Sequence, residues 1–360
     1  MQHKRTEVLV VDPVHPDSSS IERAAALLRC GEVVVFPTET VYGLGADALE
    51  TSAVEHIFAA KGRPFSDPLI VHIADGAALE QLTTSIPPQV RQLAQAFWPG
   101  PLTLVLPRSP LVPKLVTAGL ETVAIRMPRH PVALALIRAL GSPVAAPSAN
   151  RFMHVSPTTA QHALADLDGR VPLILDSGPC EVGVESTVLN LCSAVPTILR
   201  PGGVSLEALR TVVPDVQPPP QRARVTGHEG AQTEAQQSPG QLLTHYAPVV
   251  PLLLFDGPVA AMRAAMLAEV QKRIERGERV GVLVADEDVA AFRDSGALVQ
   301  SLGDARASRQ VAAALFAGLR ALEEANVQVI LSRSFDEQGM GLAIRDRLLK
   351  AAGGRVLKQS

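Results

Sequence analysis

The sequence predicts an α/β protein of two domains, and three observations support this interpretation. Its 360 residues exceed the roughly 100–200 residues of an ordinary domain. Short apolar runs alternate with segments of helical periodicity, which is typical of helices packed on a sheet. A stretch rich in Pro, Gln and Gly, residues 212–248, interrupts this pattern and separates a domain at 1–211 from a smaller one at 249–360.

Eight apolar runs in the first domain predict strands, because they are too short for helices and many are rich in Val and Ile. They span residues 8–11, 33–36, 69–73, 102–106, 123–127, 144–146, 173–175 and 188–191. The intervening segments have helical spacing, and several begin with Ser, Thr or Pro, which favour a helix start. The predicted helices are 20–29, 52–60, 88–97, 131–140 and 158–167, and we expect an at least partly mixed sheet.

The second domain shows the same alternation on a smaller scale. Residues 250–255, 279–285 and 327–331 predict strands, and residues 259–276, 308–324 and 342–352 predict helices. About 110 residues suffice for a small doubly wound domain.

Composition excludes several classes of protein. A net charge of −3 argues against a generally basic nucleic-acid coat, and one Trp, two Tyr and nine Phe offer little for base stacking. The three cysteines share no metal-ligand or redox spacing, so we expect reduced thiols in a cytoplasmic protein. No apolar run reaches the roughly 18 residues that a membrane helix needs, and the first residues have no signal-peptide core.

The common catalytic motifs are missing. No lysine follows a glycine, so there is no Walker A loop, and neither H-E-x-x-H nor G-x-S-x-G occurs. Gly43-Leu-Gly45 resembles part of a dinucleotide fingerprint but does not directly follow a predicted strand. The sequence therefore argues against a serine hydrolase, a zinc enzyme and a dinucleotide-binding protein.

Polar segments instead follow several predicted strands and helices. Any single one is explained by a turn or a helix cap, because Ser, Thr, Asn and Pro are common there. Together they bring hydroxyls and cations to the ends of apolar runs, where ligands of open α/β sheets bind. This pattern suits a polyanion such as ATP together with a carboxylate. The cations are Lys61, Arg63, Arg126, Arg129 and Arg200.

A series of longer motifs runs through the chain: FPTETVYGLGADA, KGRPFSDPLIVHI, FWPGPLTLVL, TAGLETVAIRMPRHP, APSAN followed by SPT, GVEST and LRPGG. In this order the motifs resemble the threonylcarbamoyl-AMP synthase family. SPGQLLTHYAP at the end of the linker and GMGLAIRDRLLKAA near the C-terminus are similar to the long, two-domain form of that family.

The resemblance implies a nucleotidyltransferase that makes L-threonylcarbamoyladenylate from L-threonine, bicarbonate and ATP and releases pyrophosphate. This product would begin the threonylcarbamoyladenosine modification of tRNA and would pass to tRNA threonylcarbamoyl-transfer proteins. The family's fold implies a twisted mixed sheet with a concave active-site groove, followed by a Rossmann-like domain. Mg²⁺ would accompany ATP, held by phosphate and water and not by a protein motif.

The resemblance also assigns site residues. The threonine site would comprise Thr38, Thr40, His72, Arg126, Ser148 and Ser186. The ATP site would comprise Lys61, Arg63, Asp67, Thr122, Ala146, Asn150, Ser156, Arg200 and Tyr246. Tyr246 would reach back over the nucleotide as part of a lid formed by residues 212–248. In that segment residues 241–244 read Gln-Leu-Leu-Thr, where the family carries a basic, aromatic stretch.

The expected chemistry explains the residue types. A carbamate formed on threonine must approach the anionic α-phosphate of ATP, and a preorganised cationic groove opposes the repulsion. A guanidinium such as that of Arg126 can hold a carboxylate through two hydrogen bonds. The hydroxyls of Thr40 and Ser186 can select a β-hydroxy amino acid. His72 is expected either to accept the amine proton or to orient the substrate.

Two other functions fit part of the pattern. A double-stranded RNA or tRNA-binding protein would also use a cationic groove, although net charge and few aromatic residues weigh against it. A carbamoyl-adenylate-forming carbamoyltransferase would share the first domain, but that class carries cysteine-rich metal motifs that this sequence lacks.

Overall fold

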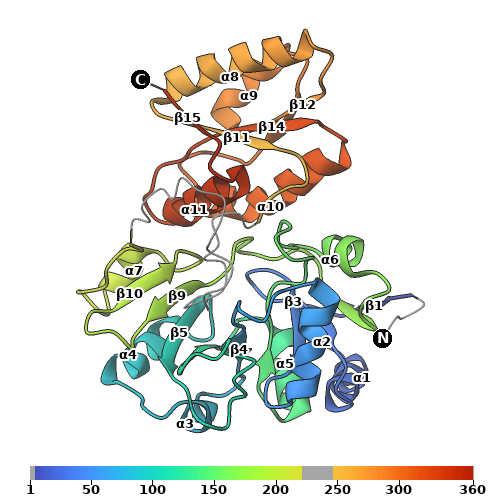
Figure 1. Cartoon of the computed structure of the whole chain (residues 1–360), viewed down its shortest axis with the longest axis vertical. Coiled ribbons are helices and arrows are strands. Elements are labelled where there is room, and N and C mark those ends of the chain that lie inside the picture. Colours follow the sequence, from blue (N-terminus) through green and yellow to red (C-terminus); the bar gives the residue numbers. More distant parts are fainter. Residues whose placement is uncertain (1–4, 221–245, 360) are drawn as a thin grey trace. The chain divides into compact units, whose positions relative to one another are not determined.

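The computed structural model describes residues 5–220 and 246–359, which divide into two compact units (Figure 1). The first unit contains the described residues up to 152, together with 157–181 and 185–220. The second contains residues 246–359 and two short segments from the first half of the chain, 153–156 and 182–184. Most of the predicted linker, residues 221–245, lies outside the described residues.

A ten-stranded sheet forms the centre of the first unit, in the order β1-β8-β2-β3-β7-β4-β6-β5-β9-β10. It contains parallel pairs such as β4 with β6 and antiparallel pairs such as β5 with β6, which confirms the predicted mixed sheet. The strands are β1 (Glu7–Val10), β2 (Val34–Phe36), β3 (Gly43–Asp47), β4 (Ile70–His72), β5 (Leu102–Pro107), β6 (Thr122–Arg126), β7 (Val144–Ala145), β8 (Leu173–Asp176), β9 (Thr187–Asn190) and β10 (Thr197–Arg200).

Strand β3 was not predicted, because its sequence GLGAD lacks β-branched residues. Its glycines allow close packing: a Cβ at Gly45 would lie 2.7 Å from the Phe36 ring and 2.8 Å from Val144 Cγ1. The Gly-Leu-Gly pattern therefore belongs to a buried strand and not to a dinucleotide-binding turn.

Helices cover both faces of this sheet. On one face α1 (Ser18–Arg29) and α5 (Pro131–Leu140) pack over β8, β2 and β7. The other face carries α2 (Thr51–Lys61), the short helices η1 (Gly76–Ala78), α3 (Leu79–Leu82) and α7 (Leu206–Arg210), α4 (Pro88–Phe97) and α6 (Ala160–Leu167). Local signals set the ends: Asp17 and Thr159 cap α1 and α6, Pro begins α4 and α5, and left-handed Gly62 and Gly141 end α2 and α5.

On the sheet face that α1 and α5 cover in part, the half formed by β4, β5, β6 and β9 carries only a small apolar cluster. Its buried members, Ile70, Val105, Ala124 and Val188, all come from strands, and within residues 5–220 no helix contributes to it. Side chains two residues away along a strand share its face. By this alternation the face of β4, β5, β6 and β9 also presents the polar residues His72, Thr103, Arg126 and Ser186.

The second unit has a parallel sheet in the order β13-β12-β14-β11-β15, which confirms the predicted Rossmann-like domain. Helices α8 and α9 lie on one side of it and α10 and α11 on the other (Figure 1). Its elements are β11 (Leu252–Asp256), α8 (Val259–Ile274), β12 (Val280–Val284), α9 (Asp286–Phe292), β13 (Leu298–Ser301), α10 (Ser308–Glu324), β14 (Val329–Arg333), α11 (Gly341–Ala352) and β15 (Val356–Lys358). Within the described ranges, no helix combines the length and apolar character needed to span a membrane.

Candidate active site

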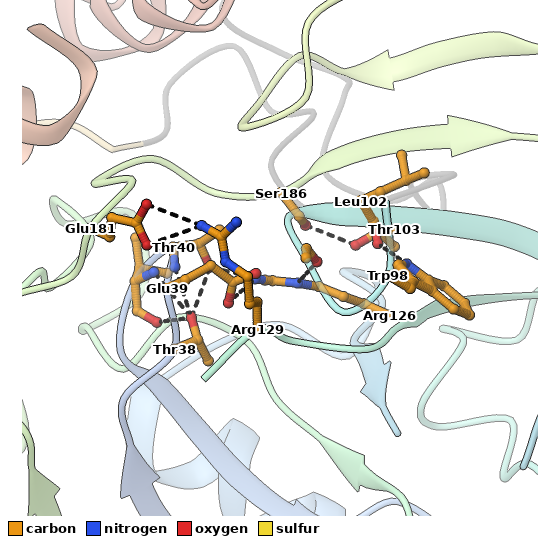
Figure 2. Close-up of polar contacts among 12 residues, drawn as sticks. Thr38, Glu39, Thr40, Trp98, Leu102, Thr103, Arg126, Arg129, Glu181 and Ser186 are labelled. Carbon is orange, nitrogen blue, oxygen red and sulfur yellow. Dashed lines mark hydrogen bonds and ion pairs between the residues drawn. The ribbon is translucent and has the colours of Figure 1, made fainter. Parts of the chain in front are cut away.

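Arg126 is the centre of one buried polar cluster (Figure 2). It ends β6, and its guanidinium donates to Thr40 Oγ1 at 2.9 Å and to the Gly100 carbonyl oxygen at 3.2 Å. Its Nη2 lies 2.8 Å from Glu39 Oε2, in an ion pair whose two side chains are both buried. Thr38 Oγ1 lies 2.8 Å from Thr40 Oγ1. The loop after β2 therefore brings the predicted Thr38 and Thr40 to the predicted Arg126.

Ser186 connects a second cation to the same sheet face. Its Oγ lies 2.8 Å from Thr103 Oγ1, and Arg200 Nη2 donates to it at 3.2 Å. Arg200 also donates to the Ser186 carbonyl oxygen at 3.0 Å. Because Thr103 on β5 is the direct cross-strand partner of Arg126, the two clusters are neighbours.

His72 lies beside Arg126 as its partner in the β4–β6 ladder. Its Nδ1 lies 3.2 Å from the Ile70 carbonyl oxygen. Burial, reinforced by the Arg126 charge, lowers the pKa of His72 to about 3. His72 is therefore neutral near pH 7, which favours an orienting role over storage of a proton.

Lys61 organises the loop that carries two predicted site residues. It ends α2 and is buried, and its Nζ donates to the carbonyl oxygens of Ser148 and Asn150. The Phe152 N–H donates to the Lys61 carbonyl oxygen at 3.0 Å. Burial lowers the pKa of Lys61 well below its usual value, and the Arg63 charge lowers it further.

Arg63 and Asp67 form a buried pair next to Lys61. Arg63 Nη2 lies 3.0 Å from Asp67 Oδ2 and donates to the Pro68 carbonyl oxygen at 2.7 Å. Burial raises the pKa of the Asp67 carboxyl, and the charges of Arg63, Lys61 and Arg200 oppose this rise. Four residues predicted for the ATP site thus interact electrostatically with one another.

Other predicted residues lie at different distances from these groups. The Ala146 N–H donates to the Ile70 carbonyl oxygen at 2.9 Å, which places Ala146 beside β4. Thr122 begins β6, four residues before Arg126 and so about 13 Å from it along the strand. Ser156 and Tyr246 belong to the second unit, where the Tyr246 ring packs 5.7 Å from that of Phe316. Residues 241–244 lie outside the described residues.

Arg129, one of the five cations in the sequence pattern, does not join the buried clusters. It makes an exposed ion pair with Glu181 at 3.0 Å (Figure 2). Sequence reasoning missed Glu39 and Thr103 as site residues. In the run LTLVL, alternate side chains point to the same face, which places Thr103 on the face of Val105. Nothing in the FPTET motif shows that Glu39 pairs with Arg126.

Comparisons with known proteins support the resemblance drawn from the motifs. Residues 26–202 match a family model described as "Telomere recombination", and residues 204–353 match "Threonylcarbamoyl-AMP synthase, C-terminal domain". A Bacillus subtilis threonylcarbamoyl-AMP synthase is 48% identical over 360 residues, covering 99% of this chain and 100% of the relative. The chain belongs to the threonylcarbamoyl-AMP synthase family.

Further similarity extends across domains of life. A threonylcarbamoyl-AMP synthase from Schizosaccharomyces pombe is 39% identical over 382 residues, covering 98% of this chain and 91% of the relative. The crystal structure of Pyrococcus abyssi Sua5 complexed with L-threonine matches with a TM-score of 0.90 at 41% identity, covering 99% of this chain and 100% of that one. The family predicted from the motifs is confirmed.

The low pKa of His72 predicts a pH-dependent stability. The unfolded chain takes up a proton on this residue below about pH 6.5, whereas the folded chain does not until about pH 3. Stability from this source is complete above pH 6.5 and is lost as the pH falls. Between pH 7.5 and 4.5, wild type should lose about 2–3 kcal/mol more unfolding free energy than His72→Gln in urea denaturation. If wild type and His72→Gln lose the same unfolding free energy, His72 is not buried and neutral. His15→Gln, at an exposed histidine, serves as the control.

The Glu39–Arg126 pair predicts a second stability effect. Glu39→Gln should lower the unfolding free energy by about 3 kcal/mol, because it leaves a buried guanidinium without its counter-charge. Glu181→Gln breaks the exposed pair with Arg129 and should cost less than about 1 kcal/mol. Urea denaturation of both variants tests the difference, and equal losses would show that Glu39 does not stabilise Arg126.

Proposed function

We propose that the chain synthesises L-threonylcarbamoyladenylate from L-threonine, bicarbonate and ATP and releases pyrophosphate. The observation that carries this proposal is a set of buried cations and hydroxyls on the sheet face that carries few apolar side chains. The relatives' shared name and the L-threonine in the P. abyssi structure support the choice of substrates.

The Arg126 cluster is proposed as the threonine subsite. A substrate carboxylate would bind the Arg126 guanidinium, and the hydroxyls of Thr40 and Ser186 would bind the β-hydroxyl. An analogue without that hydroxyl would leave these buried groups unpaired, which selects for threonine. His72, neutral and next to Arg126, would orient the substrate amine.

The Lys61 cluster is proposed as the nucleotide subsite. The amine of threonine reacts with bicarbonate, losing water, or with CO2, losing a proton, and in either case forms a carbamate. A carbamate oxygen then attacks the α-phosphorus as pyrophosphate leaves. Lys61, Arg63 and Arg200 would offset the repulsion between the two anions and the charge that grows on pyrophosphate. A bound triphosphate would also favour the charged form of Lys61, whose burial otherwise opposes it.

Mg²⁺ is proposed to enter with ATP. In the described parts of the chain, no group of three or more His, Cys, Asp or Glu side chains could hold a metal ion. The carboxylate of Asp67 is paired with Arg63, one of the proposed phosphate-binding cations. Phosphate oxygens and water would therefore be the main ligands of Mg²⁺.

We also propose that Tyr246 and the preceding linker act as a lid over the nucleotide. The support is the SPGQLLTHYAP motif and its resemblance to the family's long form. Closure would exclude water from the mixed anhydride, which hydrolyses readily. The product would then pass to tRNA threonylcarbamoyl-transfer proteins in the cytoplasm, a location that fits three cysteines without a disulfide.

Pyrophosphate release tests the proposed function directly. Wild type should release pyrophosphate from ATP only when both L-threonine and bicarbonate are present. Lys61→Ala and Arg126→Ala should each lose about 100-fold or more, because each removes a cation that faces an anionic substrate. Release that ignores threonine would refute the assignment, and tRNA binding without ATP turnover would favour an RNA-binding protein. Activity with carbamoyl phosphate in place of threonine and bicarbonate would favour the carbamoyltransferase.

A further inference from the structure

Helix α10 holds a segment that immediately follows the Lys61-bound loop. Residues Met153–Ser156 belong to the second unit. There His154 Nε2 lies 3.2 Å from Glu323 Oε2, and the buried Arg320 donates to the Val155 carbonyl oxygen. Both partners lie on the same helix, one turn apart. In the first unit Lys61 binds the start of the loop, at Ser148 and Asn150, and within the second unit α10 binds the residues that follow.

The same glutamate also holds the residues that follow the linker. The Val249 N–H donates to Glu323 Oε1, so one carboxylate binds both His154 and Val249. The Ala247 N–H donates directly to the Met153 carbonyl oxygen at 2.9 Å. Glu323 thus joins three parts of the second unit: helix α10, the segment 153–156 and the segment 246–249.

A second segment, Val182–Val184, packs closely against helix α10. At Gly183, an added Cβ would lie 2.4 Å from Ala313 Cα and 2.6 Å from the Ala313 carbonyl oxygen. The φ of Gly183 is +72°, so this position requires glycine for its backbone as well. Segment Val182–Val184 leads directly to Ser186. Within the second unit, helix α10 therefore contacts two segments that adjoin predicted site residues in the sequence.

We propose that Glu323 is a positioning residue for nucleotide binding, acting through His154 and Val249 on the segment that carries Ser156. This inference rests on the proposed function and on the family resemblance, which assigns Ser156 to the ATP site. Holding the loop before the substrate arrives reduces the entropy that binding must remove. Since Lys61, and not α10, binds the carbonyl oxygen of Ser148, the effect should appear in the KM for ATP more than in the KM for L-threonine.

Steady-state kinetics on the full chain test this proposal. Glu323→Ala should raise the KM for ATP about three- to tenfold and change the KM for L-threonine less than about twofold. Glu323→Gln keeps an acceptor for the Val249 N–H and should recover part of the loss. Glu324→Ala is the matched control, because Glu324 is exposed on the same helix. Thermal denaturation should show that all three variants are folded at the assay temperature.

A double-mutant cycle and hydrogen exchange complete the test. His154→Ala and Glu323→Ala should be non-additive in their effect on the KM for ATP, since they share one contact. Amide exchange in 151–156 and 247–249 should be faster in Glu323→Ala than in Glu324→Ala. An unchanged KM for ATP, or unchanged exchange in both segments, would overturn the proposal.

The control outcomes separate this inference from the proposed function. If wild type shows no threonine-dependent pyrophosphate release, the proposed function fails, and with it the role of Glu323 at ATP. If wild type is active and Glu323→Ala raises both KM values equally, the residue has a general structural role and the positioning proposal is wrong. A pair of glycine variants tests the contact with Ala313. Gly141 has a similar φ to Gly183, but an added Cβ there would have no neighbour within 4 Å. Gly183→Ala should therefore change the steady-state kinetics, and Gly141→Ala should not.

Discussion

A buried cation is stable only with a partner, because removing an unpaired charge from water costs several kcal/mol. The first unit buries four: Lys61, Arg63, Arg126 and Arg200. Their partners are of three kinds. Glu39 and Asp67 supply carboxylates, Ser186 supplies a hydroxyl and a carbonyl, and the loop after β7 supplies two backbone carbonyls to Lys61. These partners fix the cations in place before any substrate arrives.

The arrangement of helices explains where the cations can lie. Helices α1 and α5 cover one half of a sheet face, and the other half carries a small cluster of strand residues beside the polar set. A helix packed there would fill the face with apolar side chains. Within residues 5–220 no helix contributes there, and Arg126 on β6, His72 on β4 and Ser186 just before β9 share this surface. This half of the face can therefore hold charged and hydroxyl side chains, as the proposed function requires.

The sequence predicted the main strands and helices because Val- and Ile-rich runs and helix caps are local signals. It did not predict β3, whose glycines are explained only by the packing of Phe36 against it. The resemblance identified Arg126, Thr40 and Lys61, and the structure brings each into a buried cluster. Glu39 was not predicted as a site residue, because its partner Arg126 lies 87 residues away in the chain. The packing of segments 153–156 and 182–184 with α10 likewise depends on contacts distant in sequence.

The central claim is that separate buried cations serve separate anionic substrates. Calorimetric titration of L-threonine and α,β-methylene-ATP into wild type, Arg126→Gln and Lys61→Met tests it most directly. We expect Arg126→Gln to weaken threonine binding about tenfold or more while nucleotide affinity changes less than about twofold, and Lys61→Met to show the opposite pattern. If both variants bind both ligands with the affinity of wild type, the central claim is wrong.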